Sequence, residues 1–78
     1  MPILLRVGGF RVYILLPPRE HGPAHVHVKN ADGYCVIELA TLVVKKRRKL
    51  RDHDVVAAVW LVAEHTSELL TVWRKYHD

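Results

Sequence analysis

Cysteine is nearly absent from this sequence: Cys35 is the only one among 78 residues. A lone thiol cannot form an internal disulfide, and it is typical of proteins from reducing compartments. Long apolar runs are missing too, since the most apolar segment, 55–63, is far shorter than the roughly 20 residues of a membrane-spanning helix. The apolar start Ile3-Leu4-Leu5 meets Arg6 too early to form a signal peptide. We therefore expect a cytoplasmic protein with no membrane segment.

Acidic residues are also in the minority, with 8 Asp and Glu against 12 Lys and Arg, which gives a net charge of +4. Such a balance fits an acidic partner or nucleic acid. The length allows one hydrophobic core, so we expect a single domain over residues 1–78. Domains this small often gain stability from a metal or a partner when disulfides are absent. A metal site, a homodimer or another protein partner is therefore expected.

Glycine and proline are few, at 4 each, and their positions mark turns. Gly8-Gly9 separates two apolar runs and predicts a hairpin over 3–15 in which Arg6 lies opposite Arg11 and Ile3 opposite Ile14. Further along, apolar and polar residues alternate twice, on either side of a turn that contains Gly33. This pattern predicts two more strands, near 24–29 and 34–39.

The rest of the chain predicts a connection and one long helix. Residues 40–51 have no alternation and end in basic residues, so we expect a connecting segment there. Asp52 suits a helix N-cap, and apolar residues then recur every three or four positions over about 53–76. The predicted fold is α+β, with a small antiparallel sheet of about four strands packed against that helix.

The predicted helix carries Trp60 and Leu61 on its back, away from the sheet. An exposed Trp and Leu together indicate a partner interface. The alternative is that residues 40–44 fold over these two side chains and bury them.

A basic, aromatic surface is expected on the sheet face opposite the helix. The strand parities place these residues there: Arg6, Arg11, Tyr13, His25, His27, Lys29, Tyr34 and Glu38. Two arginines directly opposite each other repel unless an anion lies between them, and sheets with aromatic rings among cations are typical of RNA-binding modules. The alternative is a solvated face. The run Lys45, Lys46, Arg47 and Arg48 either holds phosphates as well or is a solvated connector.

Histidines are clustered just before and within the third predicted strand. His25 and His27 share a strand face about 6.6 Å apart, and His21 precedes them in a loop. With Glu20 or Glu38 they could hold a divalent transition metal such as Zn. Alternatively, His25 or His27 acts as a general acid or base, or all three are ordinary surface histidines.

The order of these features resembles a bacterial family called domain of unknown function 4160. The residues that carry the resemblance are Met1-Pro2, Leu5-Arg6-Val7-Gly8-Gly9-Phe10-Arg11-Val12-Tyr13, Glu20-His21-Gly22-Pro23-Ala24-His25-Val26-His27-Val28 and a late helix with Trp73 and Tyr76. The family usually has two prolines before the second histidine, and here Ala24 replaces the second. The basic run 45–51 is richer in charge than the family pattern, so no family role is carried onto it.

The resemblance implies one half of a toxin–antitoxin gene pair, with a small cognate protein similar to domain of unknown function 2442 as partner. It supplies no catalytic residue. We therefore expect a component of a toxin–antitoxin-type module that binds a cognate protein and, through its basic sheet face, nucleic acid. The alternatives are a metal-binding protein or metal-dependent enzyme that uses the three histidines, and an interaction module without catalysis.

Overall fold

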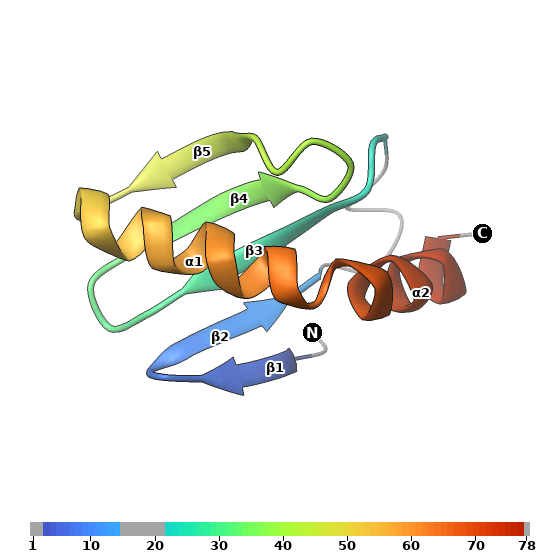
Figure 1. Ribbon diagram of the computed structural model, residues 1–78, viewed down its shortest axis with the longest axis horizontal. Helices are drawn as coiled ribbons and strands as arrows, with labels where there is room; N and C mark the ends of the chain where they lie inside the picture. Colours follow the sequence, from blue (N-terminus) through green and yellow to red (C-terminus); the bar gives the residue numbers. More distant parts are fainter. Residues whose placement is uncertain (1–2, 15–21, 78) are drawn as a thin grey trace.

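In the described part of the chain, five antiparallel strands form one sheet and two helices follow them (Figure 1). The structure is a computed structural model, and it describes residues 3–14 and 22–77. The strands are adjacent in chain order: β1 (Ile3–Val7), β2 (Phe10–Tyr13), β3 (His25–Lys29), β4 (Tyr34–Glu38) and β5 (Val44–Arg48). The helices are α1 (Asp52–Glu64) and α2 (Thr66–His77). The predicted α+β class is confirmed.

The first hairpin turns where the sequence predicted. Gly8 and Gly9 both have positive φ angles, 55° and 83°, which glycine adopts without steric cost. The pairs next to the turn match the predicted register. Further out, however, Ile3 lies opposite Tyr13 because the register shifts between residues 3 and 5, so the predicted pairing of Ile3 with Ile14 is wrong.

The fifth strand, β5, lies in the segment that we expected to be a connection. It pairs with β4 along one edge of the sheet, with a register shift that leaves Lys45 as an extra residue between Val44 and Lys46. Four of its five residues are exposed. Charged residues on an edge strand discourage pairing with other chains, and they also erase the alternation by which a strand is recognised.

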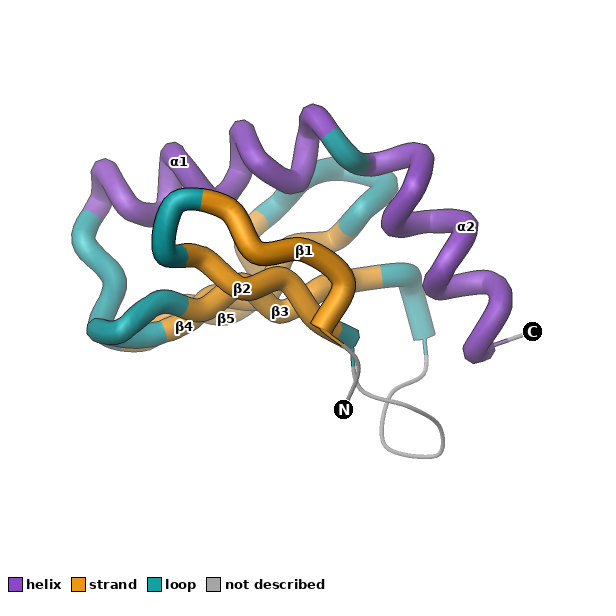
Figure 2. The backbone as a smooth tube through the Cα atoms, turned by 90° about the horizontal axis from the view of Figure 1, so that it is seen from below, coloured by secondary structure: helices purple, strands orange, loops and turns teal. Residues whose placement is uncertain are grey.

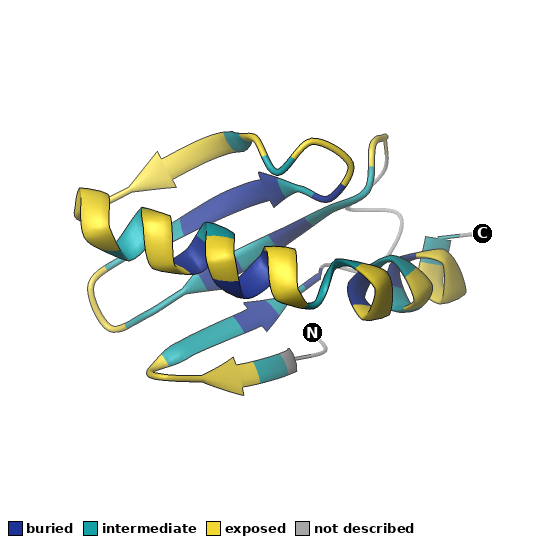
Figure 3. Cartoon of the chain, viewed as in Figure 1, coloured by how far each residue is buried: buried dark blue, intermediate teal, exposed yellow. Residues whose placement is uncertain are grey.

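The hydrophobic core lies between α1 and one face of the sheet (Figure 3). Alternate residues of β3 and β4, such as Val26, Cys35 and Ile37, are fully buried there, as their alternation predicted. From α1, Ala58, Leu61 and Val62 join the same core. Leu61 is therefore not part of an exposed interface, and that prediction is corrected.

Two helices replace the predicted long one. At His65 φ is −121°, and α1 and α2 meet at an angle of 76°. The hydroxyl of Thr66 donates to the carbonyl of Val62 at 2.9 Å, a bond that competes with the backbone pattern of a continuous helix.

The bend at His65 turns α2 down past the ends of the strands (Figure 2). Leu69 and Trp73 of α2 are consequently buried, whereas a straight helix would overhang the sheet. No single described helix is long and apolar enough to cross a membrane, and α1 with α2 meets that test only as a bent pair.

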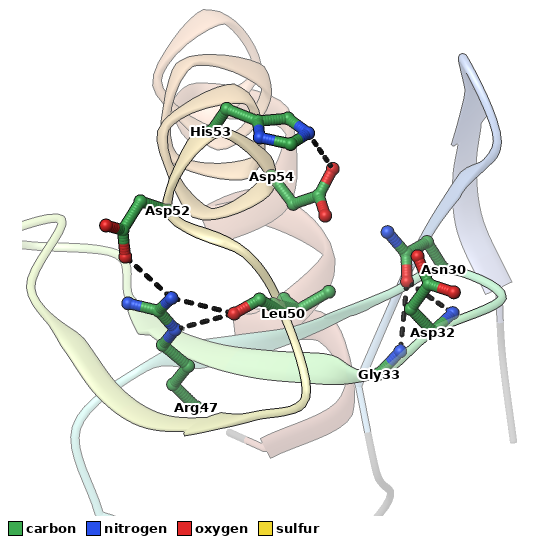
Figure 4. Close-up of polar contacts among 8 residues, drawn as sticks. All are labelled: Asn30, Asp32, Gly33, Arg47, Leu50, Asp52, His53 and Asp54. Atoms are coloured by element: carbon green, nitrogen blue, oxygen red, sulfur yellow. Dashed lines mark hydrogen bonds and ion pairs between the residues drawn. The ribbon is translucent and has the colours of Figure 1, made fainter.

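The start of α1 is fastened to β5 by Arg47. Its guanidinium donates to the carbonyl of Leu50 at 2.7 and 3.0 Å and to the carboxylate of Asp52 at 2.7 Å (Figure 4). Arg51 occupies the N-cap position with no side-chain cap, so the prediction of Asp52 as N-cap is wrong. Asp52 and Asp54 lie in the first turn, where the helix dipole favours negative charge.

Candidate functional site

The sheet face opposite α1, here called the open face, carries most of the polar side chains of the sheet. Successive residues of a strand point to opposite sides, so the neighbours of the buried core residues project here. The pairings place the following residues on it: Arg6, Arg11, Tyr13, His25, His27, Lys29, Tyr34, Val36, Glu38, Lys45, Lys46 and Arg48. One of these residues is acidic.

A row of cations crosses the open face perpendicular to the strands. Arg6 lies opposite Arg11, Arg11 opposite Lys29, Lys29 opposite Tyr34, and Tyr34 opposite Arg48. We call these five residues the cation row. Five strands about 4.8 Å apart make it roughly 19 Å long. Within the described part of the chain, none of its four cations forms an ion pair with a carboxylate.

A hollow of about 360 Å³ opens at the middle of the cation row. We call it the turn hollow; its lining is Arg11, Tyr13, Lys29, Tyr34 and the turn 30–33. In that turn the side-chain oxygen of Asn30 accepts hydrogen bonds from the backbone N–H groups of Asp32 and Gly33, at 2.8 and 3.0 Å (Figure 4). The rim of the hollow is thus held in one conformation. The ammonium of Lys46 lies 5.8 Å from the ring centre of Tyr34.

Gly33 is required by the close approach of this turn to the end of β5. A Cβ placed on Gly33 would overlap the carbonyl oxygen of Arg48 and lie 2.9 Å from the carbonyl carbon of Lys49. Lys49 itself adopts a positive φ of 59°. The turn hollow therefore depends on a backbone contact that allows no side chain at position 33.

A second hollow, of about 370 Å³, lies near the other end of the open face. His25 and Glu38 are directly opposite each other in its lining. The Glu38 carboxylate lies 3.3 Å from the ammonium of Lys45 and accepts a hydrogen bond of 3.2 Å from the hydroxyl of Thr41. The positive charge of Lys45 is accordingly balanced within the protein, unlike the charges of the cation row.

The histidine rings form part of a line of aromatic contacts that runs from β2 to α2. Tyr13 stacks on His27 with ring centres 5.0 Å apart, and His27 meets His25 at 5.6 Å. His25 contacts Trp73 at 5.0 Å, and Trp73 stacks on His77 at 3.6 Å. His25 therefore contacts α2 directly, and His27 connects His25 to Tyr13 of β2.

A metal site is not formed by the residues that the structure describes. Within 3–14 and 22–77, no three His, Cys, Asp or Glu side chains come together as metal ligands. His21 and Glu20 lie outside the described residues. The metal and general acid–base interpretations of His21, His25 and His27 stay predictions.

The family model described as Domain of unknown function (DUF4160) matches residues 9–74. The chain belongs to the DUF4160 family. This confirms the resemblance drawn from the sequence, and the matched segment contains β2 to β5, α1 and most of α2. No curated protein and no solved structure matches the chain. DUF4160 membership identifies the family without supplying an activity.

In the structure of this DUF4160 protein, the predicted basic residues lie on both faces of the sheet. Arg6, Arg11, Lys29, Lys45, Lys46 and Arg48 lie on the open face, as described above. Arg47 pairs with the buried Cys35 and is held at the start of α1, so it is not brought together with the others. The four side chains of the run 45–48 therefore do not share one face of the sheet, and phosphate binding by this run stays a prediction.

Cys35 is a core residue of this DUF4160 chain. Its thiol is fully buried, and burial raises its pKa from 9.0 to about 11, partly offset by the charge of Arg47. A thiol in that state is not a nucleophile near neutral pH. Cys35 therefore serves as a packing residue of the core.

The turn hollow was not predicted from the sequence. Asn30-Ala31-Asp32-Gly33 was recognised as a turn, but its position beside Arg11 follows from the pairing of β2 with β3. Those strands are separated by residues 14–24, whose prolines and histidine give no signal for register. The Asn and Gly of the turn were the one local hint that its backbone is tightly constrained.

Proposed function

We propose that this DUF4160 protein binds nucleic acid through the open face of its sheet. The observation that carries the proposal is the cation row, in which four positive charges without a carboxylate partner among the described residues lie beside Tyr34 across five strands. Like charges on neighbouring strands destabilise a sheet. An anionic ligand over the row would relieve that repulsion, and the relief would contribute to the free energy of binding.

The length of the cation row favours a polyanion over a single small anion. A row of roughly 19 Å spans several phosphates of a nucleic-acid strand. Tyr34 interrupts the cations, and Tyr13 lies beside them in the lining of the turn hollow. Aromatic rings among cations on a sheet are a recurring arrangement for binding single strands.

The distribution of charge over the molecule supports the same assignment. Four acidic residues lie on the helices: Asp52, Asp54, Glu64 and Glu68. Most of the cations lie on the sheet. Such an asymmetry would orient an approaching polyanion toward the sheet.

Fluorescence anisotropy with a labelled oligonucleotide tests the proposal. Four phosphate contacts on a single strand give a slope of log K against log salt of about −2.8, or roughly a 50-fold loss of affinity between 50 and 200 mM salt. The double variant Arg11→Gln/Lys29→Gln should halve that slope. The matched control Arg74→Gln/Lys75→Gln, which removes the same charge from the last turn of α2, should leave it unchanged. A flat salt response, or equal losses in both variants, would contradict the proposal.

We also propose a cognate protein partner for the outer side of α1, as expected of a toxin–antitoxin-type module. Trp60 is 66% exposed and Val56, one turn earlier on the helix, is 55% exposed. Exposed apolar residues that lie together favour a protein contact. The occupant implied by the family resemblance is a small protein similar to domain of unknown function 2442.

Co-expression tests this partner. Expression of both genes should yield a complex, and growth arrest caused by expression of the chain alone should be relieved when its neighbour is expressed as well. Trp60→Ser should weaken the complex, whereas Glu64→Gln, an exposed change on the same helix, should not. Failure to form any complex with the neighbouring gene product would remove this second proposal and leave the first intact.

A further inference from the structure

We infer that the nucleic acid bound by the open face is single-stranded, and that one unpaired nucleotide occupies the turn hollow. Arg11 and Lys29 would hold its phosphate, and its base would lie against the ring of Tyr34. This inference rests on the proposed function and adds the class of ligand. It is argued from the width of the sheet, the size of the hollow and the chemistry of its lining.

The width of the sheet disfavours base contacts with an undistorted duplex. Five strands about 4.8 Å apart are roughly 19 Å across, whereas the major groove of a DNA duplex is about 12 Å wide and admits a helix or a two-stranded ribbon. On an undistorted duplex the open face would meet phosphates rather than base edges. The aromatic rings of the face can meet a base only when that base is unpaired.

The turn hollow matches one nucleotide in size. Its volume of about 360 Å³ lies near the lower end of ligand-binding pockets, which run from about 300 to 1,000 Å³. The rim is the turn 30–33, which two hydrogen bonds to Asn30 keep in place. A hollow whose rim is fixed before binding loses little conformational entropy when the ligand arrives.

The lining supplies groups for the phosphate and for the base of a nucleotide. Arg11 and Lys29 are directly opposite each other on β2 and β3, so both positive charges belong to one edge of the hollow. Tyr34 provides a flat ring, and the nearby ammonium of Lys46 adds positive charge beside it. Asp32, on the rim, is the acidic residue of the lining and disfavours a phosphate on its side. The phosphate is thereby directed to Arg11 and Lys29, and the base to Tyr34.

Two substitutions of Tyr34 separate stacking from charge. Tyr34→Leu keeps bulk and strand propensity but removes the ring, and Tyr34→Phe keeps the ring without the hydroxyl. We expect Tyr34→Leu to weaken binding of a short single strand about tenfold or more, because stacking of one base contributes that much affinity. Tyr34→Phe should bind within about twofold of the wild type, and the affinity of all three proteins for the matching duplex should be the same.

The duplex measurement is a control for folding, because an unfolded variant would lose duplex binding as well. The comparison of the two ligands also distinguishes this inference from the proposed function. If the wild type binds both forms equally and Tyr34→Leu binds the single strand normally, the inference is overturned and the basic face still stands. If the wild type binds no nucleic acid, both fail. Should Tyr34→Leu not fold, the Tyr34 ring-proton NMR signals of the wild type decide: the single strand should shift them upfield and the duplex should not, and unchanged signals would overturn the inference.

Discussion

Replacement of Gly33 by alanine should destabilise the protein far more than a surface substitution. The added Cβ would overlap the carbonyl oxygen of Arg48, a backbone atom that cannot rotate away. The turn 30–33 and the end of β5 would have to separate by about 1 Å or more. The loss should lie at the upper end of the roughly 1–3 kcal/mol that overpacking costs.

Thermal denaturation followed by circular dichroism measures this effect. In a domain of this size each kcal/mol lowers Tm by about 4–8 °C, so Gly33→Ala should lower Tm by about 12–24 °C. Gly8→Ala is the matched control, because nothing lies within 4 Å of its Cβ position and the strain comes from a φ of +55° alone. That change should cost about 1 kcal/mol or less after the smaller entropy of the unfolded chain is included.

Asparagine separates the two mechanisms at these positions. It tolerates the left-handed conformation, so Gly8→Asn should be milder than Gly8→Ala. It does not relieve an overlap with backbone, so Gly33→Asn should be at least as damaging as Gly33→Ala. If the Tm of Gly33→Ala is no lower than that of Gly8→Ala, the turn 30–33 does not approach β5 as closely as described.

Three further perturbations follow from burial and charge. Because the raised pKa of Cys35 keeps the folded thiol protonated, the free energy of unfolding should fall by up to about 3 kcal/mol as pH rises from 9 to 11. Urea titrations of Cys35→Ala should lack that part of the pH dependence. Asp32→Asn, which spares the backbone hydrogen bonds of the turn, should strengthen oligonucleotide binding about two- to fivefold in anisotropy titrations; weaker binding would argue against repulsion at the rim. Trp73→Ala should cost about 3–5 kcal/mol in urea unfolding and Trp73→Phe much less, and equal losses would contradict the packing of α2 through this ring.

The parts of the fold that local signals determine were predictable. Gly8-Gly9 fixed the hairpin because few residues other than glycine adopt two successive positive φ angles, and alternation over β3 and β4 separated core from open face. These signals also placed Arg6, Arg11 and Lys29 on one surface. The sequence alone therefore predicted that this face of the sheet is basic.

The parts that depend on tertiary packing were not predictable. The apolar stripe over 55–76 is continuous, and the break at His65 arises because the sheet is too short to cover a straight helix. The strand β5 has no alternation, and it exists because β4 offers an edge for pairing. Arg48 joins the cation row only through that pairing, so the complete row could not be read from the sequence.

The extra residue in β5 reverses which side of the strand faces the core. If the same five residues formed a regular strand with no register shift, Val44, Lys46 and Arg48 would share one face, since strand side chains alternate with a period of two. Either two cations would then enter the apolar layer beneath α1, or Val44 would leave it. With Lys45 inserted, Val44 packs in the core while Lys46 and Arg48 project to the other side. Deletion of Lys45 would therefore keep both layers, because Val44 and Lys46 would become consecutive, as their partners Ile37 and Val36 already are. Replacement of Lys45 removes one charge, whereas its deletion also removes the irregularity from this edge strand.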